Sequence, residues 1–200
     1  MAKIYVDFYV RKIDEEMVSR LAMFGYSSAC VEGMRGRMHS FSGVRLLEKV
    51  VVEASSRGDV LEAVRVSGAK ALVSVVPATR EALMTACRDE RVATVMVHGG
   101  IAEFDKHVAE IFRNRIEVSV SELVNCFQNE KTWRNVTSFI RKAHLNGRQI
   151  IVSSGASSAE EVLPPHQLAH VAAALTDGKA GYYETVSVHP LQILRERSLA

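Results

Sequence analysis

Short apolar runs rich in β-branched residues alternate with stretches of helical spacing along nearly the whole chain. Continuous apolar runs of this kind are typical of parallel strands that are buried on both faces. The predicted strands cover residues 4–10, 28–31, 47–52, 71–76, 92–97, 116–120 and 150–152. The predicted helices between them cover residues 15–24, 59–66, 80–88, 104–112 and 132–145.

This alternation predicts an α/β fold with a mostly parallel sheet, either doubly wound or closed into a barrel. An eighth strand is predicted near residues 182–187, followed by a closing helix with Pro190 in its first turn and an end near Arg197. The pattern favours a single (β/α) TIM-like barrel of 7 or 8 strands, at the short end of the usual size of roughly 250 residues. The chain has 200 residues, 48% of them hydrophobic, so we predict one domain over residues 1–200.

Charge and cysteine content exclude several classes of protein. The 25 basic and 23 acidic residues leave a net charge of +2, which is too small to predict nucleic-acid binding from bulk electrostatics. Three widely spaced cysteines, Cys30, Cys87 and Cys126, argue against a disulfide framework and a thiolate zinc site. The amino terminus reaches Asp7 before any long apolar run. We therefore expect neither a signal peptide nor a membrane partner, and a cytoplasmic protein.

Two basic segments are candidates for contact with phosphates. In the predicted helix within residues 131–148, Trp133, Val136 and Ile140 fall on one side and basic residues on the other, with no acid on the basic face. Residues 32–44 are predicted to form a flexible basic loop after the second strand. Ordinary solvated surface remains the alternative for both. The candidate RNA contacts are Arg35, Arg37, Arg45, Lys131, Arg134, Arg141, Lys142 and Arg148.

The histidines and serines give weaker signals for catalysis. His166 and His170 are four residues apart, which on a helix is the spacing of two metal ligands. However, Gln167 stands where a zinc protease has its general base, and no third ligand lies nearby in the sequence. The turn at residues 98–100 could approach a phosphate, but ordinary turn chemistry explains its glycines. No nucleophile and base can be paired, so no catalytic residue and no metal ligand is predicted.

Motifs near both ends of the chain carry a resemblance to a known family. Residues 150–156 read IIVSSGA, residues 161–168 read EVLPPHQL, and residues 189–194 read HPLQIL. Near the amino terminus, residues 5–7 read YVD and residues 24–26 read FGY. Taken in their order along the chain, these motifs resemble those of archaeal ribonuclease P protein component 3, a family with a barrel of the polymerase and histidinol phosphatase type. Residues 44–120 are matched by pattern more than by motif.

The resemblance implies a barrel without the metal chemistry of its class. Active phosphoesterases of that class carry ligands of the type Asp-x-His-x-His on the first strand. Here the matching run is DFYVR, residues 7–11, so Tyr9 and Arg11 stand where imidazoles would be needed. Neither side chain offers a divalent metal a neutral nitrogen ligand. The chain alone is therefore expected to hold no metal or cofactor and not to be catalytic.

The resemblance also implies a function and a set of partners. The protein would be a subunit of ribonuclease P, a ribonucleoprotein endoribonuclease in which the RNA, using magnesium, removes the 5′ leader of precursor tRNA. The implied partners are the ribonuclease P RNA, ribonuclease P protein component 2 and the other ribonuclease P proteins, with precursor tRNA as the substrate. Three residues at the end of a predicted barrel strand join the candidate RNA contacts, namely Ser153, Ser154 and Gly155.

Two alternatives remain open at the level of sequence. One is a metal-dependent phosphoesterase of the same barrel class, or another enzyme that binds a phosphorylated metabolite at the carboxyl end of its barrel. The other is a protein-binding scaffold whose basic residues are ordinary surface. In the first alternative, the phosphoesterase would use four histidines, namely His98, His166, His170 and His189.

Overall fold

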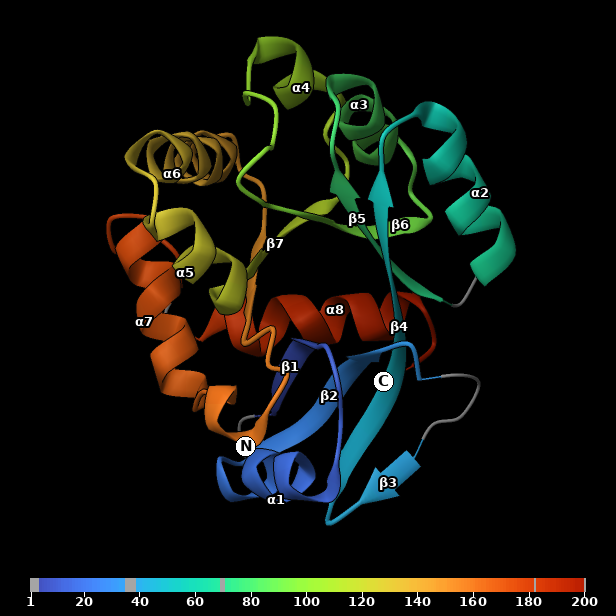
Figure 1. Cartoon of the computed structure of the whole chain (residues 1–200), viewed down its shortest axis with the longest axis vertical. Helices are drawn as coiled ribbons and strands as arrows, with labels where there is room; N and C mark the ends of the chain where they lie inside the picture. The colour runs from blue at the N-terminus through green and yellow to red at the C-terminus, as the bar shows by residue number, and fades with distance from the viewer. Residues whose placement is uncertain (1–3, 35–38, 69–70, 182, 200) are drawn as a thin grey trace.

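Parallel strands run side by side around the molecule and form one sheet (Figure 1). The computed structural model describes residues 4–34, 39–68, 71–181 and 183–199. Within these residues the strand order is β1-β2-β4-β5-β6-β7-β8, and β3 pairs antiparallel with β4. The strands are β1 (Tyr5–Val10), β2 (Tyr26–Glu32), β3 (His39–Phe41), β4 (Val44–Ala54), β5 (Leu72–Pro77), β6 (Val92–Met96), β7 (Arg115–Ser119) and β8 (Ile150–Ser153). The predicted α/β TIM-like barrel is confirmed.

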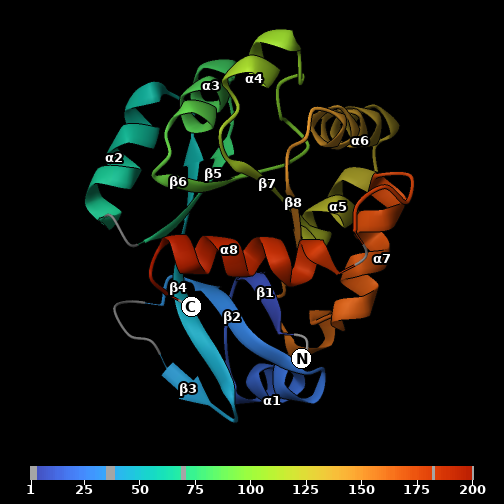
Figure 2. The same cartoon turned by 180° about the vertical axis from the view of Figure 1, so that it is seen from behind.

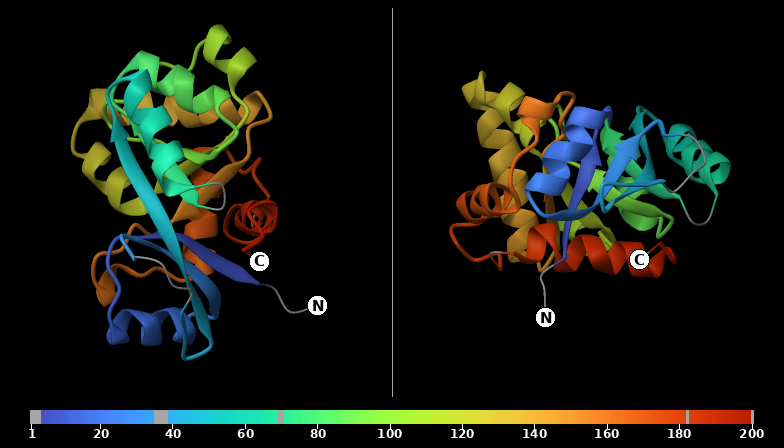
Figure 3. Two further views of the ribbon diagram at one scale, coloured as in Figure 1. Left: turned by 90° about the vertical axis from the view of Figure 1, so that its right-hand side faces the viewer. Right: turned by 90° about the horizontal axis from the view of Figure 1, so that it is seen from below.

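Helices cover the outside of the sheet (Figures 1 and 3). The helices of the described residues are α1 (Glu15–Met23), α2 (Arg57–Ser67), α3 (Arg80–Arg88), α4 (Lys106–Ile111), α5 (Val120–Phe127), α6 (Glu130–Leu145), η1 (Ala159–Glu161), α7 (Pro165–Leu175), η2 (Glu184–Val186) and α8 (Val188–Glu196), the last of which crosses the end of the barrel. Side-chain oxygens cap the first turn of α1, α2, α3, α4 and α6, and Pro165 occupies the first position of α7. In the described part of the chain, no helix is both long and apolar enough to cross a membrane.

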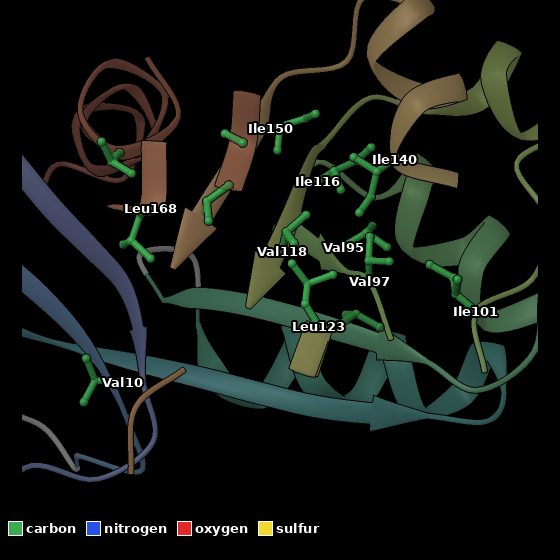
Figure 4. Packing of buried hydrophobic residues seen from close by; sticks show 14 of the residues in the cluster. Val10, Val95, Val97, Ile101, Ile116, Val118, Leu123, Ile140, Ile150 and Leu168 are labelled. Carbon is green, nitrogen blue, oxygen red and sulfur yellow. The ribbon is translucent and has the colours of Figure 1, made fainter. Parts of the chain in front are cut away.

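The sheet has apolar side chains on both of its faces, as the continuous apolar runs predicted. Outside it, residues such as Val95, Val118 and Ile140 pack in the layer between strands and helices (Figure 4). Inside it, Val6, Leu72 and other inward residues contact Ile193 and Leu194 of α8. Helix α8 passes across the barrel (Figure 2) and these two side chains fill its amino-terminal end. The closing helix is confirmed, with a physical role as a plug.

The barrel closes where β8 meets β1. The Gly155 N–H donates to the Tyr9 carbonyl at 2.9 Å, and the Arg11 N–H donates to the Ala156 carbonyl at 2.8 Å. The Asp7 carboxylate adds a second link, because it accepts bonds from the Ser154 N–H at 3.0 Å and the Ser154 hydroxyl at 2.5 Å. The SSGA motif is therefore the seam of the barrel.

Three details of the sequence prediction are wrong. The eighth strand near residues 182–187 is absent from the described residues, where η2 occupies 184–186, because β1 and β8 already bond to each other and leave no place for another strand. The 32–44 segment contains β3, so it is not wholly a loop. Helix α5 was missed, because the alternation of apolar and polar residues in the seventh strand continues into the first residue of the helix, Val120.

Gly155 is expected to be indispensable for closing the barrel. Its φ is +67°, and a Cβ there would collide with the hydroxyls of Ser119 and Ser121. Gly155→Ala should therefore lower the free energy of unfolding by about 2 to 4 kcal/mol, from left-handed strain plus overpacking. Gly25→Ala is a matched control, since Gly25 has a φ of +80° but open space around it, and should cost about 1 kcal/mol. Equal losses in urea denaturation would show that close approach at Gly155 does not matter.

Candidate functional site

The sequence resemblance predicts that the first strand carries the positions at which an active phosphoesterase would bind metal. Asp7 is buried and bonded to Ser154, and the Tyr9 hydroxyl donates to Glu32 Oε2 at 2.8 Å. The Arg11 guanidinium lies 5.9 Å from the centre of the Tyr9 ring. These side chains satisfy one another and present no cluster of metal ligands. The residues on β1 therefore do not fit the metal centre of a phosphoesterase.

The histidines of the phosphoesterase alternative do not converge either. His98 follows β6, with its Nε2 at 2.8 Å from the Pro77 carbonyl, whereas the Nδ1 of His189 lies 2.8 Å from the carbonyl of Ile150, the first residue of β8. These two histidines therefore sit at opposite ends of the barrel. His166 and His170 share one face of α7, with their ring centres 6.5 Å apart. Among the described residues, no group of three His, Cys, Asp or Glu side chains could hold a metal ion.

The barrel interior holds an ion pair that the sequence analysis missed. Lys49 Nζ donates to Glu117 Oε1 at 2.5 Å and to the Phe8 carbonyl at 2.7 Å. The other bonds to Glu117 come from hydroxyls on neighbouring strands: Thr94 at 2.6 Å, Ser74 at 3.1 Å and Ser153 at 3.3 Å. Both charged side chains are fully buried. The sequence gives no clear signal for this pair, because β4 also carries Glu48 beside Lys49 and β7 also carries Arg115.

This interior network should depend on both of its charges. Lys49→Met would leave Glu117 charged and buried, which costs about 3 to 5 kcal/mol of stability. Adding Glu117→Gln should recover part of that loss, because the amide keeps an acceptor for the surrounding hydroxyls and removes the charge. Urea denaturation of the two variants measures the difference. A double variant no more stable than the single one would show that Glu117 does not need its partner.

The pKa of Asp7 should make stability depend on pH. Burial raises the pKa of Asp7 to about 6, against the lowering effects of the bonds from Ser154 and Tyr9 N–H and the charge of Lys49. Since this pKa is above the unfolded value, the buried charge costs stability above about pH 6, and the cost disappears as the pH falls toward 4. From pH 8 to pH 5 the wild type should gain about 1 to 2 kcal/mol relative to Asp7→Asn. Parallel pH profiles in urea denaturation would contradict this.

The predicted RNA contacts at the end of β8 are buried in the structure. Ser153, Ser154 and Gly155 lie at the carboxyl end of this strand, as expected, but Ser153 and Ser154 are 0% and 2% exposed and Gly155 is buried too. Their polar groups bond to Glu117, Asp7 and Tyr9. They hold the barrel together and cannot reach an RNA strand on its surface.

The basic face of α6 is not free of acids, contrary to the sequence analysis. Arg134 pairs with Glu130 at 2.5 Å, Arg141 with Asp177 at 3.0 Å and Lys142 with Glu103 at 2.6 Å, while Lys131 is exposed. Folding brings Glu103 and Asp177 from loops that are remote in the sequence. Exposed pairs of this kind stabilise a protein by no more than about 1 kcal/mol. These cations can therefore still exchange partners, but they are compensated in the free protein.

Arg134 and Arg141 also border an apolar groove of about 490 Å³ between α5, α6 and α7. Phe127, 70% exposed, contacts Trp133 edge to face there, with ring centres 5.3 Å apart. Aromatic side chains beside arginines are typical of protein interfaces. This setting suits a protein contact at least as well as an RNA contact.

The remaining candidates are distributed over the molecule. Arg45 lies near the amino end of β4, half-buried, and its buried Nε has no hydrogen-bond partner. Arg148 precedes β8, and its Nη1 donates to the Phe112 carbonyl at 2.5 Å. Arg35 and Arg37 lie outside the described residues. Among the described candidates, four therefore lie together on α6, whereas Arg45 and Arg148 lie on other parts of the molecule.

Comparison with known proteins gives one informative likeness. No family model and no curated protein matches the chain. Among solved structures, it is similar to a chain in a "cryo-EM structure of archaeal Ribonuclease P with mature tRNA", with 15% identity, a TM-score of 0.74, and 96% of this chain and 91% of that chain covered. This chain has a ribonuclease P-like fold. It is also similar to a crystal structure of an uncharacterized protein, with 10% identity, a TM-score of 0.62, and 96% and 74% covered.

Proposed function

We propose that this protein is a subunit of ribonuclease P that assists the catalytic RNA in removing the 5′ leader of precursor tRNA. The observation that carries the proposal is the likeness of fold, over 96% of the chain, to a chain of archaeal ribonuclease P with mature tRNA. The motifs at residues 150–156 and 189–194 support the assignment to component 3, because each has a defined place in this fold. The first is the seam of the barrel, and the second begins the helix that plugs it.

The chemistry of the chain favours a binding role. Tyr9 and Arg11 replace the imidazoles of an active barrel, so bond breaking is assigned to the RNA and its magnesium. Lysine and arginine side chains would neutralise RNA phosphates and stabilise the folded RNA. The candidates that remain are Arg35, Arg37, Arg45, Lys131, Arg134, Arg141, Lys142 and Arg148.

The proposed partners follow from the same assignment. They are the ribonuclease P RNA, protein component 2, the other ribonuclease P proteins and precursor tRNA. The resemblance at residues 150–168 supports the pairing with component 2. Size-exclusion chromatography of the two co-expressed proteins tests this pairing, and separate elution at micromolar concentration would contradict it.

Reconstitution tests the function itself. Adding the chain with component 2 to ribonuclease P RNA should lower the magnesium concentration needed for half-maximal cleavage of precursor tRNA at least about twofold, because basic side chains replace part of the counterion charge. The chain without RNA should leave precursor tRNA intact. An unrelated protein of the same net charge is the control. An unchanged magnesium requirement, or cleavage by the chain alone, would overturn the proposal.

A further inference from the structure

A pocket of about 580 Å³ lies at the amino ends of β6, β7 and β8, beside the last turns of α8. We call it the arginine pocket, because its charged lining consists of Arg113, Arg115, Arg148, Arg197, Glu90 and Glu196. The arginines come from the segment before β7, from β7 itself, from the segment before β8 and from the end of α8. The pocket therefore exists only in the folded barrel. Figure 2 shows α8 crossing the barrel next to these strands.

The lining of the arginine pocket has a net positive charge. Four arginines against two glutamates give its lining a charge of +2, which equals that of the full chain. Without these six residues, the 25 basic and 23 acidic residues of the sequence become 21 of each. A net positive charge on a concave lining attracts anions more strongly than the same charge spread over the surface.

Two of these arginines have positive charges that no carboxylate in the described residues neutralises. Arg113 is exposed, and it forms no ion pair with any residue that the structure describes. Arg148 donates from Nη1 to the Phe112 carbonyl at 2.5 Å and from Nε to the Asn146 carbonyl at 3.2 Å. These neutral acceptors fix the guanidinium in place and leave its charge available. The compensated cations of α6 differ in this respect.

The other two arginines are held in position around the same space. Arg115 forms a two-pronged pair with Glu196, at 2.6 and 2.7 Å, and its Nε donates to Gln149 Oε1 at 2.9 Å. Arg197 donates to the carbonyls of Glu90 and Arg91, both at 2.8 Å. Fixed guanidinium groups lose little conformational entropy when they bind a phosphate.

We propose that the arginine pocket binds one unpaired nucleotide of an RNA strand, with its flanking phosphates on Arg113 and Arg148. Guanidinium groups match phosphate oxygens through paired N–H donors. The volume lies in the range of sites that hold one small ligand, roughly 300 to 1,000 Å³. Unpaired nucleotides in loops and bulges can enter such a site, whereas a base-paired stem cannot.

This inference extends the proposed function, because it names the part of the chain that would hold the RNA. It places the contact at the amino-terminal end of the barrel. That end lies away from the carboxyl ends of the strands, where enzymes with this fold carry out their chemistry. The contact is therefore independent of any remnant of a phosphoesterase site.

Fluorescence anisotropy with labelled ribonuclease P RNA tests the pocket on the full chain. Arg113→Ala combined with Arg148→Ala should weaken binding at least about tenfold and flatten the slope of log Kd against log salt by about 1.4, since two contacts with single-stranded phosphates are lost. Arg57→Ala with Arg65→Ala on α2 removes the same charge from exposed positions and should change Kd less than about twofold. Equal effects of the two double variants would overturn the proposal.

Further arms separate the remaining explanations. Arg113→Glu alone should also weaken RNA binding. Because Arg113 is exposed, the melting temperature of this variant should stay near that of the wild type. A blunt RNA duplex should bind weakly. Two results would contradict the proposal that the pocket holds an unpaired nucleotide of RNA: a duplex that binds as tightly as ribonuclease P RNA, or tight binding of adenosine monophosphate without any binding of RNA. If Arg113→Ala/Arg148→Ala binds the RNA as tightly as the wild type does, the proposal for the pocket is overturned and the proposed function is not. If the pocket variants lose RNA binding but ribonuclease P activity does not change, the proposal for the pocket is supported and the proposed function is overturned.

Discussion

The buried pair of Lys49 and Glu117 is the interaction on which the barrel depends most. Its hydrogen bonds join the Phe8 carbonyl on β1 to hydroxyls on β5, β6 and β8. Since the partners come from six strands, the network is complete only when the sheet is closed. A slip of one residue in β4 or β7 would turn a charge into the apolar layer under the helices. The pair therefore fixes the register of the strands, at the cost of burying two charges.

The seam and the plug isolate this network from solvent. Asp7, Ser154 and Gly155 close the gap between β1 and β8, while Ile193 and Leu194 fill the amino-terminal end. The polar groups that an enzyme of this class would direct at a substrate are here bonded to one another. Because the interior groups stabilise the barrel, the outer surface is the part that can bind a partner. This is the physical basis for proposing a binding role.

Positive charge is not evenly distributed on that surface. On α6, acids from distant loops compensate Arg141 and Lys142, whereas Arg113 and Arg148 keep their positive charges beside a pocket. A nearly neutral chain can thus present one strongly positive site. Such a site is compatible with a subunit that contacts RNA at a defined point within a larger assembly.

The sequence by itself determined most of the alternating strands and helices, the barrel class, the proline-started helix α7 and the missing imidazoles at Tyr9 and Arg11. These features depend on local periodicity and residue type, which any window of the chain contains. Only the tertiary structure decided that the barrel closes without a strand at 184–186, that Ser153 and Ser154 are buried, and that Arg141 and Lys142 have acidic partners. Those partners lie 36 and 39 residues away, and the arginine pocket joins segments from residue 90 to residue 197. Contacts over such separations are set by how the elements pack around the closed sheet, and no local pattern records them.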